Sequence, residues 1–107
     1  MTNNNNNSIF SVRPFLEKDR LNGENFITWE RTLSLLLKSE GKEDVLENPL
    51  PVVTNESSDA DKRRAKQAND RSSPIICFMV AAMELDLQRR FETKDAYTIM
   101  QELKAMF

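Results

Sequence analysis

The chain has 107 residues, enough for one small domain that buries roughly 60–65% of the surface its unfolded form exposes. Its net charge is −2, and its charged residues of both signs indicate an ordinary solvated surface rather than a strongly basic nucleic-acid-binding protein. One cysteine and no histidine exclude an intrachain disulfide and a zinc site built from histidine and cysteine.

The first 14 residues are predicted to form a disordered or extended arm that precedes a helical domain of residues 15–107. The arm opens with a run of asparagines (Asn3 to Asn7), which offers no apolar surface to bury. From Ile9 to Lys18, apolar residues surround Pro14 without a helical period. Two interpretations stay open for this segment. It packs on the helical core of its own chain, or it reaches a neighbouring subunit, in which case Phe10 is a candidate assembly residue.

The stretch from Leu21 to Gly41 predicts the first long helix. Asn25 is expected to cap it by accepting a hydrogen bond from the first turn, and Gly41 is expected to end it in the left-handed conformation. At about 100° per residue, a single apolar stripe contains Phe26, Trp29, Leu33, Leu36 and Leu37. This stripe is predicted to face the core, with the only tryptophan of the chain as its largest side chain.

Ile27 and Leu35 lie off this stripe. Leu35 points nearly opposite to Phe26 and Leu37, because nine residues at about 100° each give a half turn. Two interpretations are open. Both residues belong to an assembly surface, or the arm or the Pro49–Val53 loop of the same chain buries Leu35.

The middle of the chain predicts a short helix, a loop and a second long helix. The short helix covers Lys42 to Asn48, directs Leu46 inward, and ends because the residue before Pro49 is pushed out of the helical region. The second helix is expected to begin near Ser58. Its basic cluster from Lys62 to Lys66 is flanked by aspartates and lacks aromatic residues, so it is interpreted as a solvated face rather than a nucleic-acid site.

The last third of the chain predicts two further helical segments. Pro74 either kinks the second long helix or ends it and starts a new one. From Ile75 to Arg90, apolar residues cover more than half of the helical wheel, which indicates a central helix or one partly committed to a partner. The final helix is expected to begin with Thr93 as its N-cap. Its apolar stripe is Ala96, Ile99, Met100, Leu103, Met106 and Phe107.

These patterns together predict an all-α fold, a small bundle of four to five helices behind the N-terminal arm. The residues expected to anchor its core are Leu21, Phe26, Trp29, Leu33, Leu37, Leu46, Ile76, Met79, Met83, Ala96, Met100, Leu103 and Phe107. No cofactor or metal site is expected. Histidine, the commonest general base, is absent, Cys77 has no adjacent cation to activate it, and the two glycines form no phosphate-binding loop. The chain is therefore not expected to be an enzyme.

Three motifs carry a resemblance to a known family. Leu21 to Phe26 with Trp29, the run from Cys77 to Met83, and Asp95-Ala96-Tyr97 in the last helix resemble the Gag polyprotein of plant copia-type LTR retrotransposons, over roughly Phe15 to Phe107. The resemblance implies a fold like the N-terminal domain of a retroviral capsid protein. It also implies self-association into a lattice that forms a particle shell around the element's RNA. In such proteins nucleic-acid binding belongs to a downstream zinc knuckle, so tight binding by this segment is not expected.

The alternative is a host-adopted copy that no longer assembles and acts as a helical protein–protein interaction module. The last helix reaches Phe107 without a stop signal, which favours one half of a longer helical protein. A C-terminal capsid domain of the same polyprotein is then a further expected partner. No apolar run approaches the roughly 20 residues of a membrane span, and neither a secretion signal nor a membrane partner is expected. The single cysteine fits a cytoplasmic protein.

Overall fold

The computed structural model of the protein describes residues 18–107. Within this range the chain forms five helices and an isolated bridge between Leu21 and Met83. The helices are α2 (Phe26–Ser39), α3 (Asp44–Glu47), α4 (Asp59–Ala81), α5 (Leu85–Phe91) and α6 (Ala96–Met106). The prediction of an all-α fold is confirmed. The predicted arm of residues 1–14, including Phe10, lies outside the described residues.

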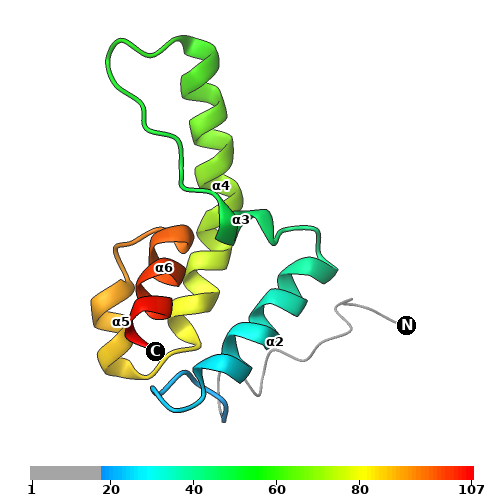
Figure 1. Cartoon of the computed structure of the whole chain (residues 1–107). Helices are drawn as coiled ribbons and strands as arrows, with labels where there is room; N and C mark the ends of the chain where they lie inside the picture. Colours follow the sequence, from blue (N-terminus) through cyan, green and yellow to red (C-terminus); the bar gives the residue numbers. More distant parts are fainter. Residues whose placement is uncertain (1–17) are drawn as a thin grey trace.

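The helices are arranged around the C-terminal half of α4 (Figure 1). In this view α5 and α6 lie on one side of α4 and α2 lies on the other. The short α3 packs against α6, and α4 contacts both α5 and α6. The N-terminal half of α4, with the loop that leads into it, extends beyond the other helices. The core therefore lies around the C-terminal half of α4, where the other helices pack.

The first long helix has the boundaries expected from the sequence, but its N-terminal capping differs. Asn25 occupies the N-cap position and makes no side-chain hydrogen bond to the first turn. Its amide instead accepts from the backbone N–H of Asn22 at 3.1 Å and donates to the carbonyl of Arg20 at 2.9 Å, so it holds the preceding turn. At the other end Gly41 has a φ of 69°, the left-handed conformation that was predicted.

Helix α4 runs without interruption through Pro74. The hydroxyl of Ser58 caps it by accepting from the backbone N–H of Asp61 at 3.1 Å. A proline removes the donor for the carbonyl four residues earlier, which here belongs to Asp70. Asp70 and Pro74 are both exposed, so water can reach this carbonyl and the helix continues. This decides between the two alternatives that the sequence left open at Pro74: the helix does not end there.

The predicted helix from Ile75 to Arg90 is wrong, because the chain turns between Ala81 and Leu85 and forms two helices. The carbonyl of Ala82 accepts from the backbone N–H of Leu21 at 2.9 Å and from the indole Nε1 of Trp29 at 3.0 Å. The backbone N–H of Glu84 donates to the carbonyl of Leu21 at 3.0 Å. A segment far away in the sequence thus supplies the partners that a continuing helix would have supplied.

The last helix begins later than predicted. Asp95, not Thr93, is the N-cap, and its carboxylate accepts from the backbone N–H of Thr98 at 2.8 Å. The prediction that Phe107 anchors the core is wrong, because this residue is 46% exposed. It lies one residue beyond the end of α6, beside the turn at Gly23.

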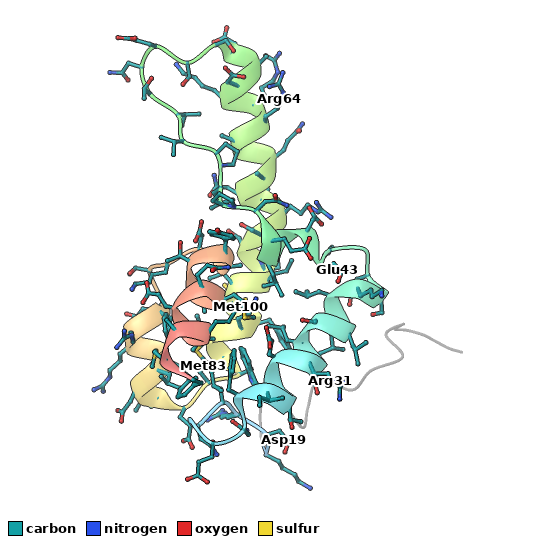
Figure 2. All side chains as sticks on the ribbon, viewed as in Figure 1. Asp19, Arg31, Glu43, Arg64, Met83 and Met100 are labelled. Atoms are coloured by element: carbon teal, nitrogen blue, oxygen red, sulfur yellow. The ribbon has the colours of Figure 1, made fainter. Side chains whose placement is uncertain are left out.

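Most of the expected core residues are buried. They are Leu21, Phe26, Trp29, Leu33, Leu37, Leu46, Met79, Met83, Ala96, Met100 and Leu103. Figure 2 shows Met83 and Met100 among the packed helices, whereas Arg31 and Arg64 point outward. Ile76 is only partly buried, since Ile75 is in register with Met79 and takes the inner position. Phe91, which the sequence analysis did not place in the core, is completely buried at the end of α5.

Candidate protein interaction surface

The outer face of α2 carries exposed apolar side chains. The buried stripe of this helix turns Ile27, Arg31 and Leu35, which are spaced four residues apart, away from the core. Ile27 is 81% exposed and Leu35 is 47% exposed. Their Cα atoms are about 12 Å apart along the axis at 1.5 Å per residue. Arg31 lies between them and points away from the other helices (Figure 2).

Leu35 is not buried by the Pro49–Val53 loop. Val52 and Val53 of this loop are themselves 89% and 44% exposed. The loop runs instead toward α6, where the backbone N–H of Leu50 donates to Asp95 at 3.4 Å. The loop alternative for Leu35 is therefore wrong. The other alternative, burial by the arm, concerns residues outside the described range.

Around Ile27 the exposed surface includes residues from the C-terminus. The rings of Phe26 and Phe107 lie with their centroids 5.6 Å apart. Beside them is an open hollow of about 270 Å³, whose lining includes Gly23, Ile27 and Phe107. A Cβ at position 23 would lie 3.4 Å from the Phe107 ring, an ordinary contact, so it is the φ of 94° that favours glycine at this turn. We call Phe26, Ile27 and Phe107 the Ile27–Phe107 patch.

Charges of both signs surround this patch. Glu24 lies in the wall of the hollow, two residues before α2 begins, and Arg31 lies on the outer face of α2. Lys104 of α6 contacts Glu30 of α2 at 3.7 Å and links the two helices that build the patch. These four residues carry two negative and two positive charges. The rim is therefore electrically balanced and favours no strongly charged partner.

A second apolar hollow lies between α2 and α4. Its volume is about 160 Å³. Apolar side chains make up most of its wall, with Glu40 and Lys42 at one end; they are Leu36, Leu37, Pro74, Ile75 and Phe78. In Figure 1 the axes of α2 and α4 diverge toward the top of the view. This hollow is a second surface suited to an apolar side chain of a partner.

The basic cluster from Lys62 to Lys66 is interrupted by acidic partners. Arg64 contacts Asp61 at 3.0 Å, and Lys66 contacts Asp70 at 3.0 Å. All four side chains are mostly exposed. The arrangement is that of a solvated helix face with intrahelical ion pairs.

The pKa of the Asp95 carboxyl group is lowered. Burial acts to raise the pKa of its carboxyl group, but hydrogen bonds from Thr98 and from the backbone N–H of Leu50 outweigh this and hold the pKa below its usual value. Its hydrogen bonds join the loop after α3 to the start of α6. These contacts give Asp95 a structural role.

Three further observations concern residues 18–107. No group of three or more His, Cys, Asp or Glu side chains in this range is placed to hold a metal ion. Cys77 is on the exposed side of α4. None of the described helices is long and apolar enough to cross a bilayer. Comparisons with protein-family models, curated proteins and solved structures give no match to this chain.

Proposed function

We propose that this chain is a structural assembly domain, the capsid region of a copia-type Gag protein, and that it self-associates in the cytoplasm into a particle shell. The observation that carries the proposal is the outer face of α2. Two large apolar residues, Ile27 and Leu35, face solvent on a helix whose other face is fully used in the core. The sequence resemblance to Gag supplies the biological context, and the all-helical fold agrees with it.

The proposed mechanism relies on many weak, repeated contacts. A contact built on two exposed apolar side chains, Ile27 and Leu35, is too small to hold an isolated dimer at low concentration. In a closed shell each subunit makes several such contacts at once, so the second and later contacts form at a high effective concentration. The domain then assembles cooperatively without any single strong interface.

Substitution of Ile27 by glutamate tests the proposal. Ile27→Glu places a charge at the centre of the exposed surface and is expected to abolish concentration-dependent association in light scattering and particles in electron microscopy. Val52→Glu is the matched control, because Val52 is 89% exposed on the extended loop. Both variants should melt like the wild type, since surface substitutions usually change stability by less than about 0.5 kcal/mol. A wild-type protein that stays monomeric at every concentration contradicts the proposal.

The second candidate function is a host-adopted interaction module that binds another protein and no longer assembles. The hollow between α2 and α4 favours it, because Leu36, Ile75 and Phe78 offer an apolar site outside the outer face of α2. Binding of an amphipathic helix there follows a common recognition mode. A wild type that remains monomeric, together with a partner whose binding is lost in Phe78→Ala but kept in Ile27→Glu, would favour this candidate.

A further inference from the structure

We propose that the N-terminal segment of the same chain, residues 9–16, docks into the hollow between α2 and α4, and that Phe15 supplies the side chain that enters it. The segment lies outside the described residues, whereas the hollow and the point at which the segment leaves the fold lie inside them. This docking is independent of the proposed self-association. It gives the hollow an occupant that any partner helix must displace.

The hollow has the size and the lining of a site for one aromatic ring. Its volume is about 160 Å³. Leu36, Leu37 and Ile75 form an apolar floor, and each of them is at most 7% exposed. A cavity of about 150 Å³ lined by leucine, isoleucine and phenylalanine side chains binds benzene. A single phenylalanine side chain is therefore the right size for this hollow.

The segment leaves the fold on the face of α4 that carries the hollow. The backbone N–H of Leu21 donates to the carbonyl of Ala82 at 2.9 Å, which fixes the chain at the end of α4. Pro74, Phe78 and Ala82 follow at four-residue spacing, so each is turned by only about 40° from the one before it. Along the axis, Phe78 lies about 6 Å and Pro74 about 12 Å from Ala82. The near end of the hollow is thus about one helical turn from the fixed chain.

The length of the segment matches this distance. An extended chain spans at most about 3.3–3.6 Å per residue. Phe15 precedes Leu21 by six residues, so it can lie up to about 20 Å from Leu21. This reach exceeds the axial distance to the hollow and leaves chain for the turn before Leu21, which Asn25 holds by donating to the carbonyl of Arg20 at 2.9 Å.

The short tether favours the segment of the same chain over that of a second copy. A binding group on a short flexible tether has an effective concentration of order millimolar, which a second copy in dilute solution does not reach. The same reasoning favours Phe15 over Phe10. Phe10 precedes Leu21 by eleven residues, and a longer tether lowers the effective concentration.

The charges at the far end of the hollow agree with this direction of the chain. The start of α2 lies beside the end of α4, and Glu40 is at the opposite end of α2 (Figure 1). With Phe15 in the hollow, Arg13 lies two residues, or about 7 Å, farther along the segment. It then comes near the carboxylate of Glu40, which also lies 4.0 Å from Lys42. An exposed pair of this kind adds little affinity, but opposite charges fix the orientation of the docked chain.

A double-mutant cycle between Phe15 and Phe78 tests the docking in the full chain. Phe15→Ala and Phe78→Ala are each expected to lower Tm, since each removes one side of the same contact. The double variant is expected to melt close to the less stable single variant, because substitutions of contacting residues are not additive, whereas those of distant residues are. Phe10→Ala is the matched control. It should lower Tm less than Phe15→Ala does, and its effect should add to that of Phe78→Ala.

Amide chemical shifts locate the docking without any substitution in the hollow. In proton–nitrogen correlation spectra of the full chain, Phe15→Ala is expected to move the amide signals of Leu36, Ile75 and Phe78. Phe10→Ala should leave these three signals in place. Both results should be the same at low and at high protein concentration, because the contact lies within one chain.

The possible outcomes separate this docking from the proposed function. Additive effects in the cycle, or shift changes confined to the sequence neighbours of Phe15, overturn the docking. A coupling between Phe15 and Phe78 that grows with protein concentration overturns docking within one chain, because a second copy then supplies the segment. A wild type that stays monomeric in light scattering contradicts the proposed assembly and leaves the coupling between Phe15 and Phe78 unchanged.

Discussion

Replacement of Trp29 by alanine tests how the buried face of α2 holds the end of α4. Trp29 is 2% exposed, and its indole Nε1 donates to the carbonyl of Ala82 at 3.0 Å. Truncation of a buried tryptophan to alanine costs about 3–5 kcal/mol through lost burial and the cavity that remains. A domain of this size has a total stability of only about 5–15 kcal/mol. The variant is therefore expected to lose a large part of its stability, from about a fifth to all of it.

The size of the effect can be measured by thermal melting followed by far-UV circular dichroism. For a domain of 60–100 residues, 1 kcal/mol shifts Tm by about 4–8 °C. Trp29→Ala should accordingly lower Tm by at least roughly 12 °C, or leave the chain unfolded at room temperature. Circular dichroism is the right probe, because the variant removes the only tryptophan and with it the fluorescence signal.

Trp29→Phe separates the hydrogen bond from the packing. Phenylalanine keeps an aromatic ring in the core but loses the indole donor. The Ala82 carbonyl still accepts from the backbone N–H of Leu21, so it is not left unsatisfied. The expected cost is about 1–2 kcal/mol, from one net hydrogen bond and a small loss of volume. If Trp29→Ala shifted Tm by only a degree or two, or if both variants lost the same stability, the anchoring role assigned to Trp29 would be refuted.

Three further predictions address other parts of the molecule. Leu35→Glu is expected to remove concentration-dependent association in light scattering while the helical signal and Tm stay within about 2 °C of the wild type; unfolding of this variant would show an intrachain role instead. The domain is expected to bind RNA with no better than micromolar affinity at ~150 mM salt, because its net charge is −2 and its basic cluster is paired with acids, and a sub-micromolar anisotropy titration would contradict this. Asp95→Ala is expected to cost about 1 kcal/mol at pH 7 through loss of the α6 N-cap. Since the folded pKa of Asp95 is lowered, its contribution is complete above the unfolded value of about 3.9 and is lost as the pH falls through the folded value. The melting temperatures of variant and wild type should therefore converge as the pH falls through the folded value, and a difference that stays constant throughout the acid titration would argue against the carboxylate.

The sequence alone determined the local features of the fold and part of the candidate site. Helical periodicity identified the buried stripe of α2 and, by exclusion, the outward position of Ile27 and Leu35. Gly41 and Pro49 marked real helix ends, because left-handed backbone and the residue before proline are restricted locally. These features depend on a few neighbouring residues, so a pattern of residues is sufficient to predict them.

Only the tertiary structure decided where the long apolar run after Pro74 is divided. The sequence pattern continues past Ala82, but Leu21 and Trp29 donate to its carbonyl from about sixty and fifty residues away, and the chain turns there. That turn also sends Phe91 into the core. In the same way, the exposure of Phe107 depends on how α6 ends against the turn at Gly23, and its position beside Ile27 joins two ends of the described chain. Contacts between distant segments leave no periodic signal in the sequence, because either partner alone is compatible with many arrangements.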